Sequence, residues 1–158
     1  MKFEELVTTR KGAIGERIVR QWMTVREMSV YQVEGARHPV DFIVIDQRNE
    51  MFFAEVKTYP RRAINADTGI DVGDFHKYAQ LASIGVLWVF FVDEIEGCCY
   101  VASFEDMQRE HSIEGDKVYF PLSLFHVLFT LTRNDLNEIR NASNVNRSQY
   151  DGVKRFFR

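Results

Sequence analysis

Three charged side chains lie in two otherwise apolar segments of the chain that have the pattern of β-strands. Asp41 stands at the start of the first segment, and Glu55 and Lys57 stand at the end of the second. Residues two apart on a strand point to the same side of a sheet, so Glu55 and Lys57 share one face. If the two segments pair as a hairpin, the carboxylate of Asp41 comes beside that of Glu55. Two carboxylates and an amine in this arrangement suit metal-assisted cleavage of a phosphodiester bond.

The oxygen atoms of this group are the kind of ligand that Mg²⁺ prefers in proteins. We expect Asp41, Glu55 and the main-chain carbonyl of Val56 to bind Mg²⁺, for which Mn²⁺ can substitute. A bound metal ion lowers the pKa of a water molecule and stabilises charge on the phosphorus oxygens. Lys57 is expected to orient the attacking water or to offset charge in the transition state. The alternative is a surface strand with an ordinary Glu–Lys alternation, which the apolar character of both strands makes less favourable.

A third carboxylate, that of Glu16, lies in a segment that has the pattern of a helix. Apolar side chains recur there at every fourth residue, which predicts a helix over residues 10–24 with one buried stripe. Arg20 follows Glu16 by four residues, and an ion pair between them is the ordinary interpretation of this spacing. Gly12 and Gly15 each cost a helix about 1 kcal/mol relative to alanine. Their presence indicates that another backbone, or DNA, approaches the helix closely.

The rest of the chain predicts a mixed sheet with helices around it. Short runs follow one another as strands at residues 29–33, 40–46 and 51–57, a helix at 74–84, and strands at 86–92, 98–102 and 117–122. The first three strands are expected to form an antiparallel meander, and the helix can act as a right-handed crossover between two parallel strands. Residues 58–73 are expected to be a long functional loop, residues 122–131 fit either a strand or a buried helix, and residues 132–141 fit a helix.

Three short segments carry most of the residues discussed above. They are Arg10-Lys11-Gly12-Ala13-Ile14-Gly15-Glu16-Arg17, Val40-Asp41-Phe42 and Ala54-Glu55-Val56-Lys57. Together they resemble the PD-(D/E)xK nuclease superfamily, and within it they are most similar to the archaeal Holliday-junction resolvases. The resemblance covers about residues 10–92. It implies that Glu16, Asp41 and Glu55 form the metal site and that Lys57 is catalytic, so it favours a functional role of Glu16 over the ion pair.

The resemblance also implies an α/β fold with a restriction-endonuclease-like core, in which a mixed central β-sheet is flanked by helices. We expect one nuclease domain over residues 1–158, with its core at about residues 8–103 and a C-terminal elaboration at residues 104–158. Many members of the superfamily carry one more polar residue on the helix after the Glu55 strand. His76 and Gln80 share a face of that helix and are the candidates, whereas Tyr78 is expected to point elsewhere.

The net charge of −3 means that DNA binding would depend on local basic patches. The candidates for DNA contacts are Arg10, Lys11, Arg17, Arg61 and Arg62, to which Arg20, Arg37, His38, Lys154, Arg155 and Arg158 could add. Basic side chains that converged on one surface would track the phosphates and give salt-sensitive binding. The alternative is a set of solvated surface charges.

These observations together predict a Mg²⁺-dependent DNA endonuclease, similar to the Holliday-junction resolvases, that acts as a homodimer or higher homo-oligomer. The alternatives are a sequence-specific endonuclease of the restriction or homing type, and a nucleic-acid-binding module that kept the fold without the activity. Cys98 and Cys99 are the only cysteines, which is typical of a reducing compartment. No segment has the pattern of a signal peptide or of a membrane span, so we expect a cytoplasmic protein without a membrane partner.

Overall fold

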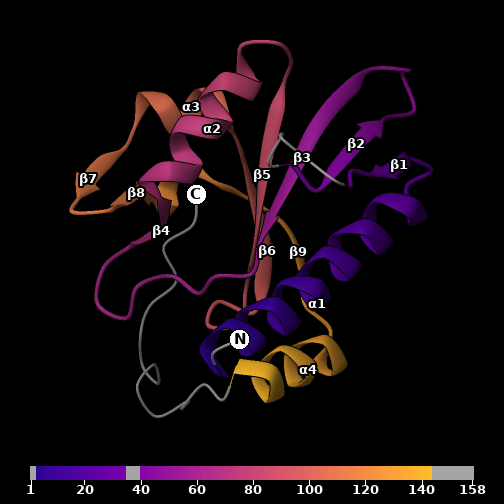
Figure 1. Cartoon of the computed structure of the whole chain (residues 1–158). Coiled ribbons are helices and arrows are strands. Elements are labelled where there is room, and N and C mark those ends of the chain that lie inside the picture. The colour runs from indigo at the N-terminus through magenta and orange to yellow at the C-terminus, as the bar shows by residue number, and fades with distance from the viewer. Residues whose placement is uncertain (1–2, 35–39, 144–158) are drawn as a thin grey trace.

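The computed structural model describes residues 3–34 and 40–143 of the 158-residue chain (Figure 1). In chain order its elements are α1 (Phe3–Val25), β1 (Ser29–Gln32), β2 (Phe42–Ile45), β3 (Met51–Lys57), β4 (Asp67–Asp71), α2 (Val72–Ala82), β5 (Leu87–Asp93), β6 (Cys98–Ser103), α3 (Phe104–Arg109), β7 (Ser112–Glu114), β8 (Lys117–Pro121), the 3₁₀ helix η1 (Leu122–Leu124), β9 (His126–Thr130) and α4 (Arg133–Ser143). The predicted α/β architecture, with helices around a mixed central sheet, is confirmed. Among the described helices, none has the length and apolar character needed to cross a membrane.

The central sheet has six strands in the order β1-β2-β3-β5-β6-β9. β1, β2 and β3 form the expected antiparallel meander, in which Phe42 pairs with Ala54. β3 and β5 are parallel, and α2 lies in the connection between them, as the crossover interpretation requires. Because Asp41 directly precedes Phe42 and Glu55 directly follows Ala54, the register of the hairpin places Asp41 opposite Glu55.

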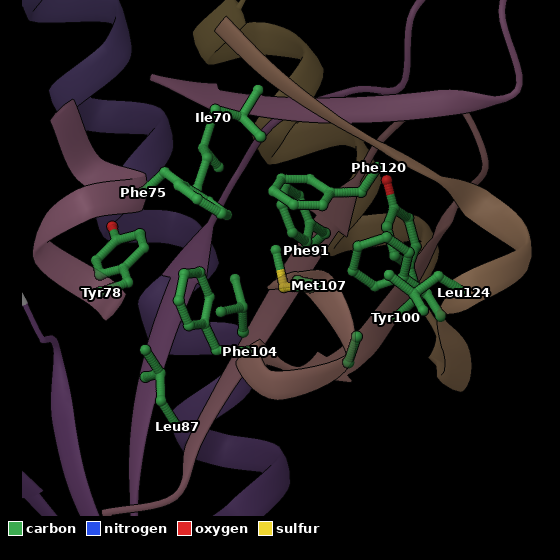
Figure 2. Packing of buried hydrophobic residues seen from close by; sticks show 14 of the residues in the cluster. Ile70, Phe75, Tyr78, Leu87, Phe91, Tyr100, Phe104, Met107, Phe120 and Leu124 are labelled. Carbon is green, nitrogen blue, oxygen red and sulfur yellow. The ribbon is translucent and has the colours of Figure 1, made fainter. Parts of the chain in front are cut away.

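The sheet separates two apolar clusters, one on each face. α1 and α4 cover one face, where Ile18, Val44 and Val92 are buried. α2, α3 and a second, smaller sheet cover the other face (Figure 1). β5 contributes to both clusters, since Phe90 packs in the first and its neighbour Phe91 packs among the aromatic side chains of the second (Figure 2). This burial on both sides explains why β5 is a continuous apolar run in the sequence.

The second sheet is the part of the fold that the sequence did not predict. The expected loop at residues 58–73 contains β4, which pairs with β8, and β7 completes a three-stranded sheet. Gly69 on β4 pairs with Tyr119 on β8, and a Cβ at Gly69 would lie 2.7 Å from the Tyr119 ring. Glycine therefore lets the aromatic ring lie across the strand. Residues 122–131 form η1 and then β9, so the strand interpretation of that segment is the one observed.

Candidate active site

The carboxylates of Asp41 and Glu55 come together at the carboxyl end of β3. Asp41 Oδ2 accepts a hydrogen bond of 2.7 Å from the main-chain N–H of Val56. Glu55 is buried, and its Oε1 accepts a hydrogen bond of 2.8 Å from the Tyr78 hydroxyl on α2. Pairing of Glu55 with Val89 on β5 fixes this part of β3 inside the sheet. The two carboxylates are thus neighbours because of the strand register, and each is held by a hydrogen bond.

Lys57 is held between two carboxylates. Its Nζ lies 3.5 Å from Glu55 Oε1 and 3.1 Å from Asp74 Oδ2. It also lies 5.3 Å from the centre of the Tyr78 ring, within the range of a cation–π interaction. Burial by itself would lower the pKa of Lys57, but Glu55 and the other nearby groups outweigh burial and raise that pKa. Lys57 is therefore a fixed cation on the same face of β3 as Glu55.

Two residues of α2 contact the cluster although the sequence pattern did not assign them to it. Asp74 accepts a hydrogen bond from Lys57, and Tyr78, contrary to the prediction, donates one to Glu55. They are four residues apart and so lie on one face of the helix. His76 and Gln80 are exposed on α2, and within the described part of the chain neither contacts the carboxylates. The sequence did carry one indication of this contact, namely that residue 78 is a tyrosine. A tyrosine hydroxyl that is buried usually needs a hydrogen-bond partner.

α1 brings Glu16 to the same cluster. The carboxyl groups of Glu16 and Asp41 lie within hydrogen-bonding reach of each other, and Asp41 contributes to the raised pKa of Glu16. Gly15 permits this approach, since a Cβ there would lie 1.9 Å from Thr58 Oγ1, one residue beyond β3. A Cβ at Gly12 would have no described atom outside its own helix within 4 Å. The close approach that the two glycines indicated therefore occurs at Gly15.

The carboxyl groups of the cluster are crowded, and their pKa values are raised as a result. Burial, followed by the charge of Asp41, raises the pKa of Glu55 to about 8. Burial and then Asp41 also raise the pKa of Glu16 to about 7. For Asp41 itself, burial raises the pKa, although the N–H of Val56 works against that shift. The three carboxyl groups have one described cation, Lys57, in contact with the cluster, and they cannot all be ionised at low cost without a further positive charge.

The donor atoms of the cluster fit a divalent cation that prefers oxygen. Glu55 Oε2 is buried and, among the described residues, has no hydrogen-bond partner. A buried polar atom without a partner is costly, and a cation would satisfy it. The described side chains do not form a ready cage of three or more His, Cys, Asp or Glu ligands. Mg²⁺ does not need such a cage, because it usually takes one or two protein carboxylates and keeps several water molecules.

The predicted DNA contacts on α1 are partly paired with acidic side chains. Lys11 Nζ lies 2.6 Å from Glu94 Oε1. Arg17 Nη2 lies 3.0 Å from Asp135 and 2.9 Å from Glu138, both on α4. These ion pairs reduce the positive charge that the two residues can offer to a phosphate. The remaining predicted contact on this helix, Arg10, is exposed.

Arg61 and Arg62 do not form the basic loop that the sequence predicts. Arg61 is 2% exposed, and its Nε donates a hydrogen bond of 2.6 Å to Glu96, so the predicted DNA contact is wrong for this residue. Arg62 is bonded to Asp67 and Glu114 on the second sheet. The acidic partners lie elsewhere in the chain, which is why the sequence alone suggested free charges. Five further candidates lie outside the described residues, namely Arg37, His38, Lys154, Arg155 and Arg158.

Comparisons with known proteins bear on the fold. No protein-family model and no curated protein sequence matches the chain. Among solved structures, the chain is similar to Hjc, a Holliday junction resolvase of Archaeoglobus fulgidus. The TM-score is 0.54 at 13% sequence identity, and the match covers 72% of this chain and 86% of that chain. The chain has a restriction-endonuclease-like fold.

Within this restriction-endonuclease-like fold, the carboxylate cluster has a favourable position. It lies at the carboxyl end of β3, one of the two parallel strands of the central sheet. In open α/β sheets, ligands commonly bind outside the carboxyl ends of the strands, where connections leave a crevice. Asp41, Glu55 and Lys57 therefore lie at the end of the sheet where ligands of such folds commonly bind.

Proposed function

We propose that the protein is a metal-dependent DNA endonuclease. The observation that carries the proposal is the cluster of Asp41, Glu55 and Lys57, in which one buried oxygen of Glu55 lacks a partner among the described residues. The fold gives further support, since a Holliday junction resolvase shares it. A pair of acids beside a fixed amine suits the hydrolysis of a phosphodiester bond.

Asp41, Glu55 and the Val56 carbonyl would hold Mg²⁺, or Mn²⁺ in its place, with Glu16 as an additional carboxyl ligand. When bound, the ion supplies an acidified water molecule and positive charge beside the phosphorus oxygens. Tyr78 orients Glu55 by donating to Oε1, which leaves Oε2 free to bind a cation. Glu16, whose pKa is raised to about 7 by burial and by Asp41, would be ionised once its carboxyl group serves as a ligand.

Lys57 would act on the charge that develops during cleavage. Asp74 holds its Nζ at 3.1 Å, so the ammonium group is already in place before the reaction begins. A donor that is fixed in advance stabilises a transition state without the cost of reorganisation. We assign to Lys57 a hydrogen bond to the attacking water or to a phosphate oxygen.

We further propose a four-way DNA junction as the substrate and a homodimer as the active form. The junction is proposed because Hjc, the structurally similar protein, is a Holliday junction resolvase. The dimer is proposed because each chain offers one candidate site, and two strands are cut most simply by two sites related by a two-fold axis.

The test is cleavage of labelled DNA by the full chain with Mg²⁺, using a four-way junction and a linear duplex of the same sequence. Wild-type protein is expected to nick the junction, and Glu55→Gln is expected to be inactive. Glu105→Gln is the matched control, because Glu105 is an exposed residue of α3 that pairs with Arg109. Cleavage by Glu55→Gln at the wild-type rate would show that the site assignment is wrong. Cutting of the duplex at one sequence would indicate a restriction-type enzyme, and binding without any cleavage a DNA-binding module.

A further inference from the structure

A groove of about 490 Å³ runs along α1 beside the proposed active site. One wall is a stripe of α1 side chains that includes Glu16 and Arg20, and the other wall contains Gln32 of β1 and Phe42 of β2. We call this feature the α1 groove. Because Phe42 directly follows Asp41 and Glu16 bonds to Asp41, one part of the groove adjoins the carboxylate cluster.

Arg20 is the residue of the α1 groove that most needs a ligand. The sequence spacing predicts an ion pair between Arg20 and Glu16, but Glu16 bonds to Asp41 instead. Arg20 is exposed, and among the described residues no acidic side chain lies within ion-pair distance of its guanidinium group. Arg17, by contrast, is held by Asp135 of α4. An unpaired guanidinium group beside a proposed phosphodiester-cleaving site is well placed to bind a phosphate.

The length and lining of the α1 groove suit a strand of DNA. From Glu16 to Thr24, α1 rises about 12 Å. That length is enough for a short stretch of one strand, which carries one phosphate per roughly 3.4 Å of the duplex axis. Gln21 and Gln32 also line the groove, and their amide groups can donate hydrogen bonds to phosphate or sugar oxygens. Arg20, Gln21 and Gln32 thus offer hydrogen-bond donors to a short stretch of DNA backbone lying in the groove.

We propose that the α1 groove binds the sugar–phosphate backbone of the DNA strand next to the cleavage site, with Arg20 as its phosphate contact. The inference rests on the proposed function, since it takes the cluster of Asp41 and Glu55 as the cleavage site. A guanidinium group donates two parallel hydrogen bonds to one phosphate, which fixes the position of the strand. Contacts with the backbone carry no base specificity, so Arg20 contributes equally to binding of any sequence.

The test is equilibrium binding of a fluorescently labelled four-way junction and of a duplex to the full chain, in Ca²⁺ and at several salt concentrations. Arg20→Ala is expected to weaken binding of both DNAs about tenfold and to reduce the slope of log K against log salt by about 1. Arg62→Ala is the matched control, because Arg62 is paired with Asp67, and it is expected to bind as the wild type does. Gln32→Arg, which adds a cation to the opposite wall, is expected to restore binding to Arg20→Ala.

The outcomes separate the α1 groove from the proposed function. Wild-type affinity and salt slope in Arg20→Ala overturn the groove proposal, whatever the cleavage assay gives. Binding that depends on Arg20, together with no cleavage by the wild type in Mg²⁺, supports the groove and overturns the endonuclease. No binding of either DNA by the wild type overturns both. Because Arg20 is exposed, the thermal unfolding curve of Arg20→Ala is expected to match that of the wild type. This measurement distinguishes loss of a DNA contact from loss of the fold.

Discussion

The carboxyl ends of the two parallel strands, β3 and β5, both carry buried acidic side chains, yet these are neutralised in different ways. At the end of β5, Asp93, Glu94 and Glu96 are almost fully buried. Asp93 accepts a main-chain hydrogen bond of 2.9 Å from Arg61. The side chain of Arg61 bonds to Glu96, and Lys11 from α1 bonds to Glu94. Glu94 and Glu96 each have a cation and Asp93 has several N–H donors, although one oxygen of Glu94 and one of Glu96 lack a hydrogen-bond partner among the described residues, as Glu55 Oε2 does. The cluster connects α1 and the segment after β3 to the β5–β6 turn.

At the end of β3, acidic side chains outnumber basic side chains by more. Three carboxyl groups, those of Glu16, Asp41 and Glu55, lie in one cluster, and the cation described beside them is Lys57, which contacts Glu55 and is also bonded to Asp74. Buried charges that are mostly paired with opposite charges connect parts of a protein, whereas a large surplus of one sign leaves a place for an external ion of the other sign. Burial of charged groups therefore does not mark a functional site by itself, and the imbalance between acids and bases is the better indicator.

Breaking the matched cluster at β5 is expected to have the largest effect. Arg61→Ala removes a buried cation from Glu96 and should lower the free energy of unfolding by about 3–5 kcal/mol. The neighbouring substitution Arg62→Ala removes a side chain that is 28% exposed, and it should cost less than about 1 kcal/mol. Urea denaturation followed by circular dichroism measures both changes. Equal losses in the two variants would contradict the structural role of Arg61.

Substitution of Lys57 in the β3 cluster should lower the cleavage rate without unfolding the protein. Lys57→Met is expected to lower the cleavage rate constant about 100- to 1,000-fold, because a fixed donor to the developing charge is lost. Affinity for the junction should change by no more than about twofold, since Lys57 is assigned to charge that develops only during cleavage. Single-turnover cleavage and binding assays give the two values. Lys77→Met, at an exposed position of α2, is the control and should retain full activity.

The two glycines of α1 offer a finer way to disturb the β3 cluster. Gly15→Ala should displace α1 from Thr58 and with it Glu16, lowering cleavage by up to about 100-fold, as a misplacement near 1 Å can. Gly12→Ala meets no described atom outside its own helix within 4 Å, and it should stabilise the protein by about 1 kcal/mol without loss of activity. Cleavage rates and melting curves of both variants test this contrast.

A second substitution shows whether crowding at Thr58 is the cause. Thr58→Ala removes the Oγ1 atom that a Cβ at Gly15 would overlap, and it leaves the Cβ of residue 58 at 3.1 Å. Gly15→Ala combined with Thr58→Ala should recover most of the cleavage rate that Gly15→Ala loses. Failure of this rescue would mean that Gly15 acts by some route other than the approach of α1 to β3.

The last expected effect is on the pH dependence of stability without metal. The pKa of Glu55 is about 8 in the folded protein against an ordinary value of 4.5, so between these values the folded state binds more protons than the unfolded state. Stability that Glu55 contributes is therefore present below pH 4.5 and is lost as the pH rises through about 8. In EDTA, the melting temperature of Glu55→Gln should rise relative to the wild type across this range, by about 2–4 °C for each kcal/mol. Mg²⁺ should remove the difference at pH 8, and a constant difference at all pH values would contradict the pKa shift.

Much of the fold and the centre of the β3 cluster could be predicted because both depend on patterns within short segments. The meander and the crossover follow from runs of apolar residues, and the register of a tight hairpin places Asp41 beside Glu55. The resemblance of three segments to a nuclease superfamily then predicts a role for Glu16 in the metal site. The structure brings Glu16 to Asp41, and its metal-binding role remains a prediction.

The residues that could not be predicted depend on contacts between distant parts of the chain. Arg61 is buried because Asp93 and Glu96 meet it from the β5–β6 turn, more than 30 residues later. β4 exists because β8 pairs with it, and its own sequence has too few apolar residues to show a period. Tyr78 was expected to point away from the candidate site, and nothing near it in the sequence reveals that its hydroxyl reaches a carboxylate. A local pattern identifies the face of an element and leaves its partner undetermined.

The hydrogen bond from the Val56 N–H to Asp41 Oδ2 decides how an inactive form of the protein should be made. The Asp41 side chain accepts this hydrogen bond where the main-chain pairing of β2 and β3 ends. Truncation to alanine would therefore leave the Val56 N–H inside the protein without an acceptor, at a cost of about 1–3 kcal/mol. An asparagine keeps an oxygen for that N–H and loses only the negative charge. Asp41→Asn is consequently the variant to choose for trapping an uncleaved DNA complex. In Asp41→Ala, a loss of activity could result from damage to the hairpin and not from loss of the catalytic carboxylate.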